Sequence, residues 1–238
     1  MPDLNFTVEG VEMASFSASP QILFRLRVTN FDAVETIHSV SLRCQIQIDV
    51  TRRRYTPEDQ LKLRDLFGEP ERWSQTLRNL LWTHVNLNVP AFQGSTLVDL
   101  PVPCTFDFNV GATKYFYGLA EGFVPLCFMF SGTVFYAPGD EHLQVAPIPW
   151  SKETRFSLPV RVWQEMMDFY YPSSAWLCLR REVFDRVYDY KVRHGIPTWE
   201  QALERLLDRE SPPPESGPAQ ETAAGLKLRG ILLKNSGM

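Results

Sequence analysis

Apolar and polar residues alternate one by one along several stretches of the chain. In residues 40–50 the even positions hold Val, Leu, Cys and Ile, and the odd positions hold Ser, Arg, Gln and Asp. The same alternation runs through 21–29, 85–89, 98–110 and 156–162. A period of two buries one face of a strand and leaves the other face to solvent. These stretches therefore predict antiparallel β-strands that share a core.

Two predicted strands depart from this simple pattern. Pro101 and Pro103 fall on the polar side of 98–110, and each removes a backbone donor, so this strand is expected at a sheet edge or broken. Residues 124–136 are apolar on both faces. Such a strand has to be covered from both sides, by an opposing sheet and by a second layer.

Between the strands, the period changes from two to that of a helix. Thr56 is suited to cap a helix, Pro57 to occupy its first position and Gly68 to end it. A second helical spacing follows in Trp73, Leu77, Leu80 and Leu81. We therefore expect a helical insertion at about 56–82.

The C-terminal part of the chain also has helical spacing. After a short first segment, a second helix is predicted over 173–195, and a third opens with the capping box of Thr198 and Gln201. We expect these helices, at 163–208, to cover the outer face of the strand at 124–136, because that strand needs a second layer.

The predicted fold is mainly β, bordering on α+β: an immunoglobulin-like antiparallel β-sandwich with a helical insertion and a C-terminal helical cover. The sandwich spans 1–162, and the helices of 163–208 pack on it. Residues 211–238 are rich in Pro, Ser and Gly and predict a disordered tail. Its basic and apolar end suits a contact with a partner protein or a membrane surface, and a frayed terminus is the alternative. The basic residues of that end are Lys227, Arg229 and Lys234.

Composition and charge narrow the classes of function. The chain has 238 residues, 44% of them hydrophobic, and a formal net charge of −4, which supports a large core and disfavours a general nucleic-acid binder. The longest strongly apolar run, 123–130, is too short to cross a bilayer, and the N-terminal residues lack a signal-peptide pattern. We expect a cytoplasmic protein with reduced cysteines, and an oxidising location with two disulfides is the alternative. The cysteines are Cys44, Cys104, Cys127 and Cys178.

The chain contains no recognisable catalytic motif. It has no GxSxG, GxGxxG, P-loop, CxxC or HExxH pattern, and we expect no cofactor. Asp140, Glu141 and His142 form the densest group of metal-ligand side chains and are the candidates for a metal site. They follow a predicted turn at 137–139, and turns attract polar residues in any case, so the turn interpretation is favoured.

Arg52 and Arg54, in the run TRRRY, are candidates for contact with a partner. If the preceding strand continued, these two arginines would extend its apolar face, and Arg53 would join its polar face. The favoured interpretation is a brace in which the outer arginines reach Glu58 and Asp59, and the alternative is an anion-binding site.

Trp82 and Trp150 are the tryptophans least constrained by the predicted elements. If exposed on a β-sandwich, they could stack on a sugar or another small ligand. Burial in the core is the favoured interpretation, because large aromatic side chains are mostly buried.

A series of motifs occurs in order between residues 6 and 207. They are QILFRLRVTN, RCQIQI with RRRY, LFGEPERW, VPCTFDF, KYFYGLAEGFVPLCFMFSGTVFY, PIPW and PTWEQAL. Together they resemble an uncharacterised bacterial domain family that is typically encoded beside genes of high-affinity, oxygen-tolerant nickel–iron uptake hydrogenases. The resemblance implies a role in hydrogenase assembly or support, with a hydrogenase subunit or maturation factor as partner. It implies no catalytic residues, and the chain lacks a CxxC pair or a His-rich tract for direct delivery of nickel.

The expected function is that of a non-catalytic accessory or scaffold protein that binds another protein. A β-sandwich that binds a small ligand or carbohydrate is one alternative. An unrecognised enzyme is the other.

Overall fold

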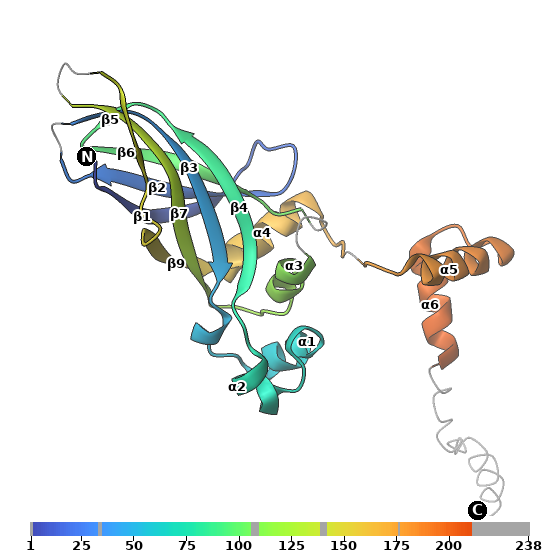
Figure 1. The fold of residues 1–238 in the computed structure, drawn as a ribbon. Helices are drawn as coiled ribbons and strands as arrows, with labels where there is room; N and C mark the ends of the chain where they lie inside the picture. Colours follow the sequence, from blue (N-terminus) through green and yellow to red (C-terminus); the bar gives the residue numbers. More distant parts are fainter. Residues whose placement is uncertain (1, 33–34, 106–109, 139–141, 176, 211–238) are drawn as a thin grey trace, which may run out of the picture. The chain divides into compact units, whose positions relative to one another are not determined.

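The computed structural model describes residues 2–32, 35–105, 110–138, 142–175 and 177–210 (Figure 1). The chain divides into two compact units, Met1–Trp176 and Leu177–Met238. Strands account for 40% and helices for 32% of the structure, and the sheets are antiparallel, so the predicted mainly β class is confirmed. Among the helices of the described ranges, none has the length and apolarity that a membrane span requires.

Two antiparallel sheets form most of the first unit. The smaller sheet has the order β1-β2-β6, and the larger has the order β4-β3-β7-β8, with β5 paired to β3 and β9 paired to β7. The strands are β1 (Leu4–Met13), β2 (Gln21–Asn30), β3 (Thr36–Ile48), β4 (Leu80–Val89), β5 (Phe92–Gln93), β6 (Ser95–Pro103), β7 (Phe123–Ala137), β8 (Gln144–Pro147) and β9 (Glu153–Pro159).

The alternating residues place the core between the two sheets. The even-numbered apolar residues of β2 and of β3 from position 40 onward are buried, as their alternation predicted. Phe6 of β1 stacks on Phe130 of β7 with ring centroids 4.4 Å apart, and Phe24 of β2 meets Phe128 of β7 at 5.0 Å. Because each contact joins one sheet to the other, the buried faces of the sheets share one core.

β6 lies at an edge of the smaller sheet, as its two prolines predicted. The strand is shorter than expected, however. It ends at Pro103, and Val110 begins the helix α3 (Val110–Tyr117), so the strand predicted over 98–110 is corrected. The reason is the partner strand: β2 begins at Gln21, opposite Pro103, and beyond it the Cys104 N–H donates one further bond to the Pro20 carbonyl at 2.9 Å.

The helical insertion is also shorter than the apolar spacing indicated. Helix α1 (Pro57–Phe67) begins and ends as predicted. Beyond it the chain forms a 3-10 turn (Pro70–Arg72) and the short α2 (Trp73–Thr76), and β4 already starts at Leu80. The helical prediction is therefore wrong at the end of the insertion, because pairing of β4 with β3 overrides the local spacing.

Helices α3 and α4 (Val160–Tyr170) pack against the ends of both sheets (Figure 1). Phe116 of α3 lies between Trp82 of β4 and Trp163 of α4, with ring centroids 5.1 and 5.2 Å away. Trp82 in turn contacts Phe24 of the smaller sheet at 6.3 Å. This series of ring contacts fixes the two helices to the core.

The outer face of β7 is only partly covered within the first unit. Phe123 is 59% exposed, and Pro125 and Met129 are half-buried. Helix α4 packs mainly against β1, β2 and β9. The cover of this face by the C-terminal helices stays a prediction.

The second unit contains the helices α5 (Arg181–Arg193) and α6 (Trp199–Glu210). Helix α6 has its predicted cap, since the Gln201 N–H donates to Thr198 Oγ1 at 3.2 Å. The helix predicted from residue 173 begins only at Arg181. Ser173 has a φ of 53°, in the left-handed region, which does not continue a right-handed helix.

All four cysteines are free thiols. Cys44, Cys104 and Cys127 are buried and Cys178 is exposed. None of the four is bonded to another in the structure, and their redox state stays a prediction.

Candidate interaction site

The segment that joins α3 to β7 and ends on Phe123, the first residue of β7, has its backbone held by groups from other elements. We call it the 118–123 loop. Five consecutive carbonyls, those of residues 119–123, each accept a hydrogen bond from outside the loop. The bonds run from Gln164 Nε2 to Leu119 O and Ala120 O at 3.2 Å each, from Arg53 Nη2 to Glu121 O at 2.5 Å, from Val160 N to Gly122 O at 2.9 Å, and from Arg53 Nη1 to Phe123 O at 2.6 Å. The loop is therefore held in place by these bonds, although only its last residue, Phe123, belongs to a regular element.

Arg53 and Asp59 form the buried support of this loop. Their side chains are 8% and 1% exposed, and Arg53 Nη2 lies 3.5 Å from Asp59 Oδ2. Asp59 is the third residue of α1, where it completes a capping box with Thr56. Its Oδ2 accepts from the Thr56 N–H at 3.2 Å, and its Oδ1 accepts from the Ala120 N–H at 3.1 Å. One carboxylate thus fixes both the start of the helix and the 118–123 loop.

The two glycines of the loop allow this close packing. Gly122 has a φ of +86°, and a Cβ there would lie 3.4 Å from Arg53 Nη1. A Cβ on Gly118 would lie 2.5 Å from Leu63 Cδ2 of α1. A side chain at position 118 would force Leu63 or the loop to move, whereas at position 122 it would strain the left-handed backbone.

A pair of tyrosines lies beside the Arg53 side chain. The Tyr55 hydroxyl donates to Val50 O at 2.8 Å and is 3.0 Å from the Tyr115 hydroxyl. Burial raises the pKa of Tyr115 strongly, and burial also raises the pKa of Tyr55. Both phenols are therefore neutral hydrogen-bonding groups at physiological pH, and their role next to Arg53 is structural.

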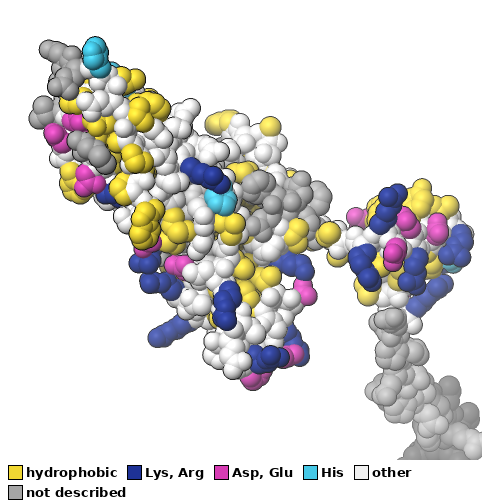
Figure 2. Space-filling view, viewed as in Figure 1, with side chains coloured by type: hydrophobic (Ala, Val, Ile, Leu, Met, Phe, Trp, Pro, Cys, Tyr) yellow, Lys and Arg dark blue, Asp and Glu magenta, His cyan; other side chains and the backbone are white. Residues whose placement is uncertain are grey.

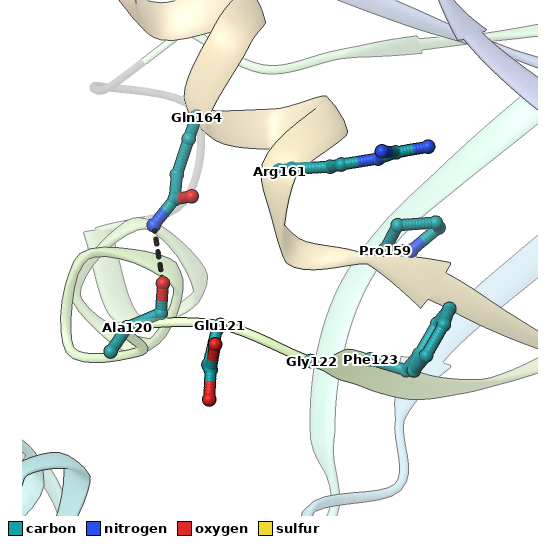
Figure 3. Close-up of a pocket in the computed structure, with 7 residues that line it drawn as sticks. All are labelled: Ala120, Glu121, Gly122, Phe123, Pro159, Arg161 and Gln164. Carbon is teal, nitrogen blue, oxygen red and sulfur yellow. Dashed lines mark hydrogen bonds between the residues drawn. The ribbon is translucent and has the colours of Figure 1, made fainter.

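The outer side of the loop borders a pocket of about 400 Å³ (Figure 3). Its apolar wall includes Phe123 and Pro159, and its charged residues are Glu121 and Arg161. Figure 3 shows the Gln164 amide nitrogen directed at the Ala120 carbonyl, which leaves the amide oxygen directed into the pocket. The pocket is open and its floor is the fixed loop, so its chemistry suits binding of a side chain from a partner.

A second pocket, of about 260 Å³, lies on the other side of Gln164. Its ring-bearing residues are Tyr117, Trp163 and Tyr171, and its acid is Asp168. Burial raises the pKa of Tyr117, and the neighbouring Asp168 and Tyr171 raise it further. Both pockets include Gln164, and we call the two together the α4 pockets.

The structure places the arginines of TRRRY differently from the prediction. β3 ends at Ile48, and a 3-10 turn over Val50–Arg52 ends the alternation of faces. As a result, the middle residue, Arg53, meets Asp59, whereas Arg52 is exposed and its Nε lies 3.7 Å from Asp49 Oδ2. The predicted brace from Arg52 and Arg54 to Glu58 and Asp59 is thus corrected. Glu58 pairs instead with Lys62 at 2.7 Å, and Arg54 is exposed.

The other predicted site residues do not form a common site in the structure, or they lie outside the described ranges. Trp82 is 4% exposed and part of the core, whereas Trp150 is 91% exposed between β8 and β9. His142 is exposed, and Asp140 and Glu141 lie outside the described residues. Lys227, Arg229 and Lys234 also lie outside them. Within the described ranges, no group of three or more His, Cys, Asp or Glu could hold a metal ion.

Sequence reasoning missed Arg53 as the buried arginine, and it missed Gln164 and the 118–123 loop altogether. The available signal was the pair of glycines in GLAEG, which flank a loop between two apolar segments. Glycines alone do not identify the side chains that pack on them. Those side chains come from parts of the chain far away in sequence.

Comparisons with known proteins identify a family for this chain, and that family has no known function. A model described as a family of unknown function, DUF6084, matches residues 1–215. No curated protein matches the chain. Among solved structures, the crystal structure of the “Putative ApaA Protein from Bordetella pertussis” is similar at 13% sequence identity, covering 66% of this chain and 95% of that chain with a TM-score of 0.24. A TM-score this low supports no comparison of folds.

Proposed function

Since the chain belongs to the family of unknown function DUF6084, we propose its function from the site itself. The protein binds another protein, without catalysing a reaction, through the exposed side of the 118–123 loop and the adjoining α4 pockets. This proposal carries forward the accessory or scaffold role expected from the sequence and assigns that role a surface.

The observation that carries the proposal is the use of buried polar groups to fix an exposed loop. Arg53 and Asp59 are buried, which is costly for charged groups unless they are well satisfied. Most of their hydrogen bonds go to the backbone of the 118–123 loop and not to each other. A loop fixed before binding loses little conformational entropy when a partner arrives.

The side chains on the fixed loop have the chemistry of an interface. Phe123 is 59% exposed on a rigid backbone, and large aromatic residues are enriched among the residues that dominate binding energy. Hydrophobic side chains reach the surface of the first unit in several places, interspersed with basic ones (Figure 2). Exposure alone therefore does not single out Phe123, but the fixed backbone beneath it does.

The cellular setting we infer is assembly or support of a nickel–iron uptake hydrogenase. The motifs that resemble hydrogenase-associated proteins support this setting, and a hydrogenase subunit or maturation factor is the partner it favours. Deleting the gene in the native host should lower hydrogen uptake or impair maturation of the large subunit. Unchanged uptake together with unchanged maturation would remove this part of the proposal and leave the binding surface to be tested separately.

Site-specific photo-crosslinking tests the binding surface. Phe123 is replaced by a photo-reactive phenylalanine analogue in the native host, and Leu97 of β6, also exposed at 42%, is replaced in a parallel strain. We expect a discrete crosslinked partner from position 123, identified by mass spectrometry, and little from position 97. Equal or absent crosslinking at the two positions would refute the 118–123 loop as an interaction surface.

A carbohydrate-binding role is the second candidate, and it now depends on Trp150 alone. Trp82 cannot stack on a sugar, because it is in the core.

The immunoglobulin-like character of the two sheets is likewise a proposal, supported by two antiparallel sheets that share one core.

A further inference from the structure

The second of the α4 pockets is built from two helices. One face of α4 and its end supplies four lining residues at the spacing i, i+3, i+4 and i+7, namely Gln164, Met167, Asp168 and Tyr171. Tyr117, the last residue of α3, lines the pocket from the other helix. The shape of the pocket therefore depends on the packing of α3 against α4 and not on a single loop.

The buried part of its lining is held in place by the core. Trp163 is 3% exposed and stacks on Phe116 with ring centroids 5.2 Å apart. The ring of Tyr117 meets the Trp163 ring at nearly a right angle, with centroids 4.8 Å apart. Met167 is buried, whereas Tyr117 is 40% exposed. The pocket thus has a fixed apolar floor, and Tyr117 is the aromatic residue that a ligand can reach.

The turn after α4 closes one end of the pocket and is fixed by hydrogen bonds. The Ser174 N–H donates to Tyr171 O, and the Ser174 hydroxyl donates to Pro172 O, both at 3.2 Å. Ser173 has a φ of 53°, which side chains other than glycine seldom adopt and which persists only where the surrounding structure holds it. Tyr171 and Ser174 are therefore kept in the lining by the turn itself.

Of the described residues that line this pocket, Asp168 is the only charged one. Within the described ranges, no Lys or Arg forms an ion pair with it. Burial raises the pKa of the Tyr117 phenol, and Asp168 and Tyr171 raise it further, so the three groups are close neighbours. The pocket thus places one negative charge beside an accessible aromatic ring.

This combination suits a single cationic group on an apolar stem. The stem can pack on the Tyr117 ring while the charged head pairs with the Asp168 carboxylate. An anion would be repelled by that carboxylate. A purely apolar group would desolvate the carboxylate without supplying a counter-charge.

The size and position of the pocket favour a side chain of a bound protein. Its volume of about 260 Å³ is below the roughly 300–1,000 Å³ of sites that enclose a drug-sized molecule. Gln164 lines the pocket and also donates to the carbonyls of Leu119 and Ala120. The pocket therefore adjoins the 118–123 loop, and a partner bound to the exposed side of that loop can reach it.

We propose that the second of the α4 pockets binds one basic side chain, lysine or arginine, of the partner protein. Asp168 is its counter-charge, and Tyr117 is the surface on which its stem packs. The proposal rests on the proposed function and names the type of residue that the partner presents beside the 118–123 loop. It assigns specificity to Asp168, which makes none of the hydrogen bonds that hold the loop.

Methyl NMR with the full chain tests the pocket directly. The probe is n-butylammonium, which has the shape and charge of the end of a lysine side chain, and n-butanol is the neutral control. The chain has six methionines, so isotope labelling of their methyl groups gives few signals, and Met167→Leu identifies the signal from the pocket. We expect a saturable shift of the Met167 signal with n-butylammonium and a much smaller one with n-butanol. Asp168→Asn should weaken binding of n-butylammonium about fivefold, as expected for loss of one partly exposed charge pair.

Asp99→Asn provides the matched control, because Asp99 is an exposed acid on β6 of the smaller sheet. This variant removes the same charge and should bind n-butylammonium like the unaltered chain. Equal weakening by the two variants would mean unspecific attraction, and binding of n-butanol as tight as that of n-butylammonium would mean that charge is not recognised. Either result overturns the proposal.

Photo-crosslinking in the native host decides whether the basic group belongs to a partner protein. Asp168→Asn and Asp99→Asn are each combined with the photo-reactive residue at position 123. The yield of the partner adduct should fall by up to about fivefold with Asp168→Asn and stay unchanged with Asp99→Asn. An unchanged yield with both variants, in a chain whose pocket binds n-butylammonium, would mean that the pocket takes a free amine, and this overturns the proposal.

The failure of this inference can be told apart from failure of the proposed function. If position 123 crosslinks to a partner and n-butylammonium does not bind, only the basic side chain is refuted. If n-butylammonium binds and position 123 gives no adduct, the 118–123 loop is refuted as an interaction surface, and with it the partner as the source of the cation.

Discussion

Two arginine–carboxylate pairs in the first unit have the same chemistry and different uses. Arg27 and Glu9 meet directly across β1 and β2, with two hydrogen bonds at 2.5 and 3.0 Å, and both side chains are 39% exposed. Arg53 and Asp59 are almost fully buried and lie 3.5 Å apart. The two side chains of the exposed pair bond to each other, whereas the buried pair makes most of its hydrogen bonds with the backbone of the 118–123 loop.

The difference shows what burial does to a charged pair. An exposed pair exchanges hydration for a contact of similar strength and contributes little to stability. A buried pair cannot return to water when one partner is lost, so its removal leaves an uncompensated charge. The buried pair is therefore stabilising only as a complete network, and the loop it holds depends on the same network.

The largest effect should come from Asp59→Ala. The substitution leaves the Arg53 guanidinium buried without its counter-charge and removes the acceptors of the Thr56 and Ala120 N–H groups. We expect a loss of about 3–5 kcal/mol in the free energy of unfolding, measured by urea denaturation. Asp65→Ala on the same helix is the control, because Asp65 is 74% exposed and pairs with Lys114. A similar loss from both variants would contradict a special role for the buried pair.

Gly122→Ala should have the next largest effect. The residue has a φ of +86°, and the new Cβ would lie 3.4 Å from Arg53 Nη1. We expect a loss of about 1–2 kcal/mol in urea denaturation, from the left-handed backbone alone. Crosslinking from position 123 should also fall. Gly10→Ala, where the nearest atoms lie 3.8 Å away, is the control and should change neither quantity. A variant that loses stability but keeps full crosslinking would separate the Arg53 network from the interface.

Most of the strands could be predicted from the sequence because alternation is local evidence. The strands predicted over 98–110 and 156–162 are corrected at their ends, since β6 stops at Pro103 and β9 stops at Pro159, where α4 begins. Alternation within 40–50 already contains the information that one face of β3 is buried, and the prolines of β6 already mark an edge. The helix predicted through Leu80 and Leu81 failed because those residues pair with β3. Spacing within a short segment cannot reveal a partner that lies far away in the chain.

The candidate site could not be predicted for the same reason. The orientation of Arg53 depends on a 3-10 turn that ends the alternation after β3. The alternating pattern of the strand does not predict that turn. The site also needs Asp59, Gln164 and the 118–123 loop to meet, and they lie on separate elements. Only the topology of the fold brings them together, so their contacts could not be predicted from the sequence around each residue.

Alkaline pH should weaken the buried region selectively. Burial raises the pKa of Tyr115, so the folded state keeps this phenol protonated at a pH where the unfolded chain ionises it. Its contribution is complete below about pH 10 and is lost as the pH rises above that value, by up to about 1.4 kcal/mol per pH unit. Urea denaturation at a series of pH values between about 8 and 11 should show that the free energy of unfolding falls less steeply with pH in Tyr115→Phe than in the unaltered chain. Tyr188→Phe, at an exposed tyrosine of α5, should leave the slope unchanged.

The smallest effect should come from Arg27→Ala. The hydrogen bond from Arg27 lowers the pKa of Glu9, so whatever the pair contributes is present at neutral pH and is lost as the pH falls below about 4. Because both groups are solvent-exposed, we expect no measurable shift of the urea midpoint at physiological salt, and at most a small one at low salt. The pair also leaves the 118–123 loop untouched, so crosslinking from position 123 should persist. A loss of stability comparable to that of Asp59→Ala would mean that direct pairing, and not burial, determines how much an arginine–carboxylate pair contributes in this protein.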